Sequence, residues 1–319
     1  MTRFRVIVTE PINAVGVEYL RKKRVNVYEL PPGSNEENLM ELIGEADGLI
    51  TRGSIRITRE MMERSPRLKA VGVHGMGCDH VDLKAAEELG KVVCNTPDAL
   101  TVTVAEMTLA LTLAAFRNLV AADKAVRAGQ WNRKYGDLIG LELAGKTVGI
   151  VGMGRIGTAT AKRLRAFDAD VVYWSRTRKP EAEQELGVTW MELDELLKAC
   201  DIVSLHVPGT DETQHLIGER ELGLMKQGVI LVNMARGMVV DEDALIRALR
   251  SGKIRAAALD VFEKEPISPE NPLMKMDNVI LTPHLGACNL EGMQRMAVQV
   301  AEGVWKAMNG QRPDNPVVV

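Results

Sequence analysis

Short runs of β-branched residues alternate with helical segments along most of this chain, and this alternation constrains its fold more than any other feature. The pattern is typical of parallel sheets whose connections are helices. The first series of predicted strands lies at residues 4–9, 25–28, 48–51, 68–74 and 91–95. Helices are predicted between them at 14–23, 36–45, 58–65 and 82–89. These units predict a mainly parallel sheet that is covered on both faces.

A second series of the same kind begins at Lys146, after a single long helix predicted at 101–127. Its strands are predicted at 147–151, 170–174, 201–206, 228–233, 255–261 and 278–281. Six parallel strands favour a doubly wound sheet. The last stretch, 290–309, carries apolar residues at helical spacing and is too short for another domain, so we expect it to pack back onto the first series.

A length of 319 residues fits about two domains at roughly 150 residues each. We therefore predict an α/β protein with two doubly wound parallel-sheet domains. A Rossmann dinucleotide-binding domain at 99–286 is expected to be inserted into a discontinuous, flavodoxin-like substrate-binding domain made of 1–98 and 287–319.

Composition excludes several classes of partner and location. A formal charge of −3 provides no positive field for nucleic acid or an anionic membrane. Threonines and a glutamate interrupt the apolar stretch at 99–116, which favours a buried helix over a membrane span. The first residues hold too short an apolar run for a signal peptide, and the four cysteines lie far apart, so we expect a cytoplasmic chain with reduced thiols and no zinc site.

The run GMGRIG places Gly152, Gly154 and Gly157 directly after a predicted strand and directly before a predicted helix. In that context the glycines allow a tight turn and let a pyrophosphate approach the helix N-terminus. A glycine turn that serves only helix packing is the alternative. We predict a dinucleotide site here.

The end of the next strand indicates which dinucleotide is preferred. An acid about 20 residues after the glycines would accept a hydrogen bond from the ribose hydroxyl of NAD. Ser175 stands there instead, followed by Arg176 and Arg178, whose guanidinium groups can bind a 2′-phosphate. NADP(H) is therefore expected to be preferred, with NAD(H) possible. The alternative is that both arginines lie on a solvated turn.

Three later strands are each followed by a charged or ionisable residue, namely Arg236, Glu265 and His284. Ligands of open α/β sheets bind at the carboxyl edge, so these groups are candidates for one site. The remaining histidines, for which we expect structural roles and no metal, are His74, His80, His206 and His215.

The chain resembles the D-isomer specific 2-hydroxyacid dehydrogenase family from about Gly48 to Gly303. The motifs that carry the resemblance occur in family order: VGVHGMGCDHVDL, NTPDALTVTVAE, GMGRIG, SLHVPGT, NMARGMVVDEDAL, ALDVFEKEP and TPHLGA. It implies that Arg236, Glu265 and His284 are catalytic. Reduction of a 2-oxoacid needs a proton for the carbonyl oxygen and a fixed cation for the carboxylate. His284 would be the acid, Glu265 would keep its ring charged and oriented, and Arg236 would hold the carboxylate.

The resemblance also implies further contacts. The backbone at Gly75, Met76 and Gly77 is expected to bind the substrate carboxylate as a small anion nest. Asp260 resembles the family residue that bonds the nicotinamide carboxamide. The other residues expected to line the dinucleotide are Arg155, Ile156, Val207, Met234, Ala235 and Gly286.

The substrate stays open between two members of the family. Arg52 stands where phosphoglycerate dehydrogenases have an arginine for the substrate phosphate. The SRTR turn resembles NADPH-using glyoxylate and hydroxypyruvate reductases, and the extra regulatory domain of longer phosphoglycerate dehydrogenases is not expected. We favour reduction of glyoxylate, hydroxypyruvate or a close relative, with 3-phosphoglycerate dehydrogenase as the alternative.

A dinucleotide-sensing corepressor is a third reading, from a different class of protein. The family is usually dimeric, and the apolar helix from Thr101 favours a homodimer.

Overall fold

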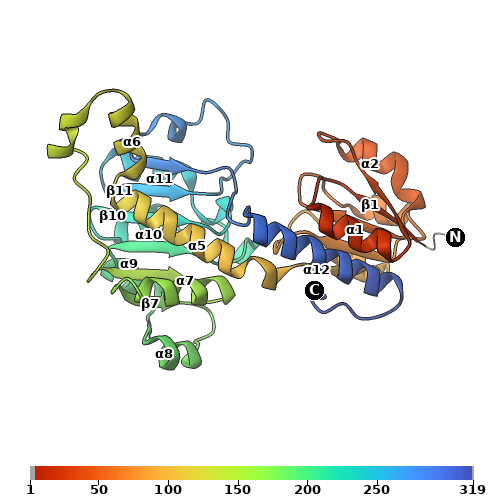
Figure 1. The fold of residues 1–319 in the computed structure, drawn as a ribbon. Helices are drawn as coiled ribbons and strands as arrows, with labels where there is room; N and C mark the ends of the chain where they lie inside the picture. The colour runs from red at the N-terminus through yellow and green to blue at the C-terminus, as the bar shows by residue number, and fades with distance from the viewer. Residues whose placement is uncertain (1–3, 318–319) are drawn as a thin grey trace. The chain divides into compact units, whose positions relative to one another are not determined.

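The computed structural model describes residues 4–317, and the chain divides into two compact units (Figure 1). The first unit is Met1–Leu100 with Ala287–Val319, and the second is Thr101–Gly286. Each unit contains one sheet in which all paired strands are parallel. The predicted α/β class with two doubly wound parallel sheets is confirmed.

The sheet of the first unit has the order β2-β1-β3-β4-β5, which is the flavodoxin-like order. Its strands are β1 (Phe4–Val8), β2 (Val25–Glu29), β3 (Gly48–Thr51), β4 (Ala70–Val73) and β5 (Val92–Cys94). Its helices are α1 (Ala14–Lys22), α2 (Glu36–Leu42), α3 (Arg59–Glu63), α4 (Leu83–Glu88) and α12 (Leu290–Met308), with a 3-10 turn η1 (Ile43–Glu45). Helix α12 packs against α1 and the sheet through buried Ala297, Val300 and Val304.

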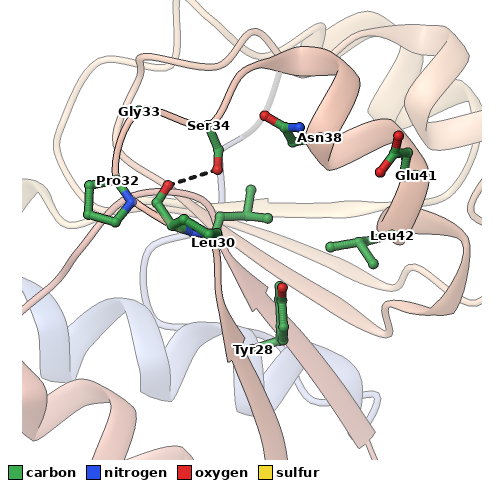
Figure 2. Close-up of a pocket in the computed structure, with 9 residues that line it drawn as sticks. Tyr28, Leu30, Pro32, Gly33, Ser34, Asn38, Glu41 and Leu42 are labelled. Atoms are coloured by element: carbon green, nitrogen blue, oxygen red, sulfur yellow. Dashed lines mark hydrogen bonds between the residues drawn. The ribbon is translucent and has the colours of Figure 1, made fainter.

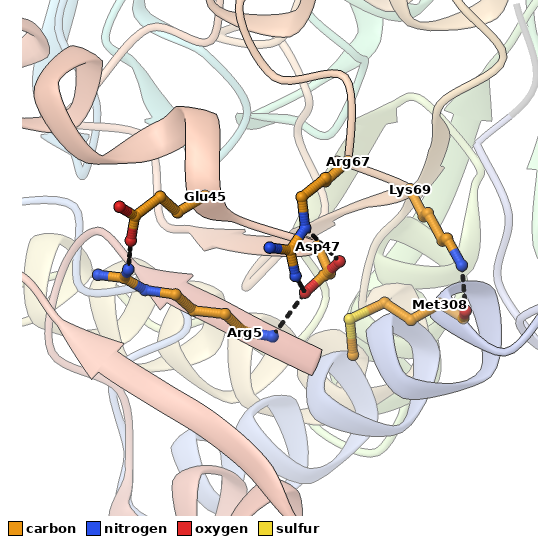
Figure 3. Close-up of polar contacts among 6 residues, drawn as sticks. All are labelled: Arg5, Glu45, Asp47, Arg67, Lys69 and Met308. Carbon is orange, nitrogen blue, oxygen red and sulfur yellow. Dashed lines mark hydrogen bonds and ion pairs between the residues drawn. The ribbon is translucent and has the colours of Figure 1, made fainter. Parts of the chain in front are cut away.

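The amino edge of this sheet is held by a buried carboxylate (Figure 3). Asp47, only 5% exposed, lies just before β3 and accepts the backbone N–H of Arg5 at 2.8 Å. Arg67 donates to the same carboxylate from Nε at 3.2 Å and Nη2 at 2.8 Å. Nearby, Lys69 Nζ donates to the carbonyl of Met308 at the end of α12. These bonds join β1, β3 and the segment before β4 at the edge opposite to the strand ends that carry the candidate site residues.

The second unit has a seven-stranded sheet with the order β12-β11-β10-β9-β6-β7-β8. Its strands are β6 (Thr147–Val151), β7 (Asp170–Trp174), β8 (Thr189–Trp190), β9 (Ile202–Leu205), β10 (Val229–Asn233), β11 (Ile254–Leu259) and β12 (Val279–Leu281). Its helices are α7 (Arg155–Arg165), α8 (Pro180–Leu186), α9 (Leu193–Ala199), α10 (Glu219–Leu224) and α11 (Glu242–Arg250). The 3-10 turns are η2 (Trp131–Tyr135), η3 (Asp211–Thr213), η4 (Gly237–Val239) and η5 (Pro272–Lys275).

Two features of this sheet matter for the site. The chain reverses direction across the sheet between β6 and β9, which is the position where Rossmann folds bind dinucleotides. The two-residue strand β8 extends the sheet beyond the six strands predicted, because so short a strand leaves almost no pattern in the sequence.

The prediction of one helix at 101–127 is wrong. The structure has α5 (Pro97–Phe116) and α6 (Leu119–Arg127), separated at Asn118, whose φ of 50° is left-handed. Asparagine tolerates that conformation, and its amide donates to the carbonyls of Asp137 and Ile139. By length and composition α5 is the one helix among residues 4–317 that could cross a membrane, a test that buried core helices also pass.

Candidate active site

The glycine turn between β6 and α7 is built by contacts that leave no room for side chains. Gly152 has φ +105°, and a Cβ there would lie 2.7 Å from the backbone carbon of His206. A Cβ on Gly157 would lie 2.1 Å from the carbonyl oxygen of Gly152. These two glycines therefore hold α7 against the end of the strand.

Gly154 differs from both, because a Cβ there would meet nothing within 4 Å. It is exposed and is the N-cap residue of α7, so the first N–H groups of the helix have no side chain of their own N-cap above them. Arg155 and Ile156 form the first turn of this helix. An open glycine at the positive end of an 11-residue helix fits a pyrophosphate, so the residues present suit the predicted dinucleotide.

The two arginines after β7 have different surroundings. Arg178 donates to Glu183 from Nε at 2.8 Å and from Nη2 at 2.7 Å, so both arms of its fork are used within the chain. That guanidinium and the Tyr173 hydroxyl lower the pKa of Glu183 to about 2. Arg176 is exposed and lies 3.9 Å from Glu212, while Ser175 donates to the carbonyl of Thr177. The sequence prediction did not include this contact with Glu183. Because Glu183 engages Arg178, Arg176 is the better placed arginine for a phosphate.

Val207, Met234 and Ala235 follow β9 and β10 at the carboxyl edge, and each is less than 10% exposed. The Ala235 N–H donates to the Asn233 side chain at 3.0 Å, which fixes the turn after β10. A Cβ on Gly286 would lie 3.1 Å from the methyl group of Met234. This apolar group of residues lies beside the glycine turn, since β9 pairs with both β6 and β10.

Glu265 and His284 form a direct pair in the second unit. Glu265 Oε2 lies 2.8 Å from His284 Nδ1, and Glu265 Oε1 accepts the N–H of Phe262 at 3.1 Å. Burial raises the pKa of Glu265, but the hydrogen bond and charge of His284, the Phe262 amide and the charge of Arg236 together lower it below its ordinary value. A carboxylate that stays ionised in this way stabilises a charged imidazole next to it.

Arg236 ends the turn after β10 and reaches the same edge. Its Nη1 donates to the carbonyl of Ala235 at 2.8 Å, and its stem packs so closely on Gly209 that a Cβ there would lie 2.8 Å from Arg236 Cγ. Its charge is one of the causes that lower the pKa of Glu265.

Asp260 organises the segment that carries His284. It is 2% exposed, and its Oδ1 accepts from Thr282 Oγ1 at 2.6 Å and from the N–H of Leu285 at 2.7 Å. Its Oδ2 accepts the N–H of Gly286 at 2.7 Å, and its carbonyl accepts the N–H of His284 at 2.9 Å. His284 has φ +53°, a conformation that persists only where the surroundings fix it. The sequence indicated only a contact with nicotinamide for Asp260 and missed this role.

In the first unit, the backbone at residues 75–77 is oriented by the end of β5. The Gly75 carbonyl accepts from the Thr96 N–H at 2.9 Å, and the Met76 carbonyl accepts from the Asn95 side chain at 2.8 Å. In a trans peptide the next N–H points the opposite way, so the N–H groups of Met76 and Gly77 face away from these partners. That orientation suits an anion nest.

Arg52 follows β3 and is held by a residue that the sequence analysis did not single out. Glu10, just after β1, accepts the Arg52 N–H at 3.0 Å and the Ser54 N–H at 2.7 Å. Arg52 Nη1 donates to the Pro11 carbonyl at 2.7 Å. Glu10 could have been found as the first charged residue beyond β1, at the same sheet edge as Arg52.

Two of the remaining histidines, His74, which is buried, and His206, which is half-buried, have lowered pKa values. Burial lowers the pKa of His206 to about 4, and its Nε2 lies 2.9 Å from Ser204 Oγ. Burial, with the charge of Arg52, lowers the pKa of His74 to about 4 as well.

A surface hollow of about 480 Å³ lies in the first unit, between the end of β2 and α2 (Figure 2). Its lining includes Tyr28, Leu30, Ser34 and Glu41. Its described lining contains no predicted site residue, so the hollow is separate from the groups above.

Residues 109–286 match the protein-family model described as D-isomer specific 2-hydroxyacid dehydrogenase, NAD binding domain. Arg236, Glu265 and His284 all lie within the matched region.

The proteins that this chain is similar to include glyoxylate reductases and D-3-phosphoglycerate dehydrogenases. Glyoxylate reductase from Thermococcus litoralis is 42% identical over 319 residues, and the match covers 98% of this chain and 96% of that protein. D-3-phosphoglycerate dehydrogenase from Methanocaldococcus jannaschii is 41% identical over 314 residues, covering 98% of this chain but only 59% of the longer protein. The structure of an NADPH-dependent glyoxylate/hydroxypyruvate reductase from Sinorhizobium meliloti, in complex with NADP and malonate, gives a TM-score of 0.88 at 33% identity, with 99% and 97% of the two chains covered.

Proposed function

Because this chain belongs to the D-isomer specific 2-hydroxyacid dehydrogenase family of NAD(P)-dependent oxidoreductases, we propose that it reduces a small 2-oxoacid such as glyoxylate or hydroxypyruvate. The observation that carries the proposal is the 2.8 Å contact between Glu265 and His284, with Arg236 acting on the same carboxylate. An acid and a cation at one sheet edge match what a 2-oxoacid requires.

Each of the three side chains has a separate task in this reaction. Bound NAD(P)H supplies the hydride that the carbonyl carbon accepts. Because Nδ1 of His284 bonds Glu265, Nε2 is the atom that donates the proton to the carbonyl oxygen. Glu265 keeps the ring oriented and stabilises its charge. Arg236 binds the carboxylate of the substrate and fixes its orientation.

In this proposal the turn that Gly152, Gly154 and Gly157 form would hold the pyrophosphate, and Asp260, which orders residues 282–286, would contact the nicotinamide. NADP(H) is preferred, because Ser175 replaces the usual acid and Arg176 is exposed next to it. The structure of the S. meliloti relative with NADP supports this preference. Arg176→Ala should raise the Kd for NADPH more than the Kd for NADH, whereas Arg178→Ala should change both much less.

A second candidate function follows from Arg52. In this alternative the protein is a 3-phosphoglycerate dehydrogenase. Residues 75–77 bind the substrate carboxylate, and Arg52 binds the phosphate at the other end of 3-phosphohydroxypyruvate. The Arg52 side chain already donates to the Pro11 carbonyl, so the unphosphorylated oxoacids are the first choice.

The protein acts as a cytoplasmic homodimer in this proposal. Large apolar side chains are exposed around α6 and η2, at Leu119, Trp131, Tyr135 and Ile139. Exposed apolar side chains gathered in this way mark an interface. Light scattering at micromolar concentration should give twice the mass of 35.0 kDa.

The decisive experiment measures kcat/KM for glyoxylate, hydroxypyruvate, pyruvate and 3-phosphohydroxypyruvate with NADPH and with NADH. We expect the highest value for glyoxylate or hydroxypyruvate with NADPH. His284→Ala should lose most of the rate while its Kd for NADPH is unchanged, and unchanged turnover would refute the assignment. A wild-type protein that binds nucleotide without turning over any oxoacid would instead indicate a dinucleotide-sensing corepressor.

A further inference from the structure

The second unit contains another His–Glu pair, His215 and Glu263, whose glutamate lies two residues before Glu265. We propose that His215 and Glu263 are positioning residues. They fix the turn after β10 that carries Arg236 (the Arg236 turn) relative to the loop after β11 that carries Glu265 (the Glu265 loop), without touching substrate. This inference rests on the proposed roles of Arg236 and Glu265.

His215 connects the segment after β9 to the Arg236 turn. Its Nε2 lies 2.8 Å from Glu263 Oε1, and its backbone N–H donates to the Met238 carbonyl at 2.8 Å. Its φ of +49° is left-handed, so its backbone is held in a strained conformation while it makes both contacts. Gly209, from the same segment, packs against the Arg236 stem. The segment after β9 contacts the Arg236 turn through His215 and Gly209, and its Ile217 N–H also donates to the Val239 carbonyl at 3.0 Å.

Glu263 connects His215 and the Arg236 turn to the Glu265 loop and to α11. Its Oε1 also accepts the N–H of Glu242 at 3.2 Å, and its own N–H donates to Glu242 Oε2 at 3.4 Å. Since Glu242 is the first residue of α11, the Glu263 side chain and backbone are both fixed to a helix. Glu263 stands two residues before Glu265 in the same loop, so fixing Glu263 restricts the start of the segment that carries Glu265.

Gly237 shows how closely the two backbones approach. A Cβ there would lie 1.9 Å from the carbonyl carbon and oxygen of Phe262 and 2.4 Å from the Glu263 nitrogen. A proposed catalytic residue lies next to each of the two backbones. Arg236 directly precedes Gly237, and the Phe262 N–H donates to the Glu265 carboxylate. The contact between Gly237 and Phe262 prevents the Arg236 turn and the Glu265 loop from approaching more closely, and the His215–Glu263 bond opposes their separation.

The pair itself is half exposed, with side-chain exposures of 46% and 38%. Exposed ion pairs add little to folding stability. Its loss should therefore change the geometry of the site far more than the stability of the unit.

The test compares three single variants, the His215→Asn/Glu263→Ala double variant and a control in the full-length protein. Glu263→Ala removes the acceptor of both His215 and Glu242, whereas Glu263→Gln keeps an acceptor oxygen. His215→Asn tolerates the left-handed backbone but is too short to reach Glu263. Glu195→Ala is the control, because it breaks an exposed pair with Lys198 of the same 2.8 Å length on α9. Each variant is assayed for kcat and KM with the best oxoacid, the Kd for NADPH and the melting temperature.

We expect Glu263→Ala and His215→Asn to lower kcat by about tenfold or more, since small misplacements of reacting groups cost up to about 100-fold. Their NADPH affinity and melting temperature should match the wild type, and the double variant should be no slower than the slower single one, because both lose the same contact. Glu263→Gln should recover most of the rate, and Glu195→Ala should keep all of it.

Wild-type kcat in both Glu263→Ala and His215→Asn would overturn the inference, as would a loss of rate matched by an equal loss of NADPH affinity. If Glu263→Ala does not fold, His215→Asn alone decides, because it leaves the Glu242 contacts intact. Failure of the wild type to turn over any oxoacid is a different result: it refutes the proposed function and the inference with it.

Discussion

Replacing Asp260 with asparagine tests the claim that one buried carboxylate orders the segment that carries His284. The carboxylate accepts three hydrogen bonds, two at Oδ1 from Thr282 and Leu285 and one at Oδ2 from Gly286. Asparagine offers one oxygen and one NH2 group. In either orientation its NH2 group faces at least one backbone N–H, so one of the bonds is replaced by two opposed donors.

The size of the effect follows from these contacts. A hydrogen bond to a charged group is worth about 1.5–3 kcal/mol, and a buried unsatisfied donor costs about 1–3 kcal/mol. Because Asp260 is only 2% exposed, water does not replace the lost acceptor. We expect Asp260→Asn to lower the free energy of unfolding by about 2–4 kcal/mol. We also expect kcat to fall by about tenfold or more, since His284 loses its fixed backbone.

Urea denaturation measures the free energy of unfolding, and steady-state kinetics with NADPH measures kcat. The matched control is Asp241→Asn, because Asp241 is the N-cap of α11 and accepts the Ala244 N–H at 2.9 Å. Asparagine is as good an N-cap as aspartate, so this variant should resemble the wild type. An Asp260→Asn protein with wild-type stability and rate would show that the carboxylate does not organise residues 282–286.

Three further predictions follow from the same structure. Gly237→Ala must move its new Cβ from 1.9 Å to the 3.4 Å of ordinary contact, so it should destabilise the unit by about 1–3 kcal/mol and slow turnover, whereas Gly223→Ala, with nothing within 4 Å, should be neutral or stabilising. Because the folded pKa of Glu265 lies below its ordinary value of 4.5, the stability that its charge contributes is present above pH 4.5 and lost as pH falls through the lowered value. The stability gap between wild type and Glu265→Gln, measured by urea at several pH values, should therefore close in acid, and a constant gap contradicts this reading. Asp47→Ala should lower the free energy of unfolding by about 1–3 kcal/mol, because it leaves the buried Arg5 N–H without its acceptor. It should leave kcat unchanged, because this N–H lies at the amino edge of the sheet, away from the carboxyl ends of the strands. A matching loss of kcat would show that the amino edge also shapes the site.

The regular elements could be predicted well because their signals are local. The strand at Gly48–Thr51 was predicted at its observed bounds, and β6 and β7 likewise, since apolar β-branched runs are bounded there by turn residues. The break between α5 and α6 was missed, because Asn118 takes a left-handed conformation that hydrogen bonds from the distant residues 137–139 stabilise. A residue-by-residue pattern does not contain such contacts.

By itself the sequence determined the chemistry available to this protein: the glycine turn, an arginine, a glutamate and a histidine after successive strands, and a serine in place of the usual acid. Those features are composition and order along the chain. Only the tertiary structure decided which partner each of these groups contacts. It engages the Arg178 fork with Glu183, makes Asp260 the anchor of the His284 segment and presses Gly237 against Phe262. Each of these outcomes depends on distances of a few ångströms between segments far apart in sequence, and packing alone sets those distances.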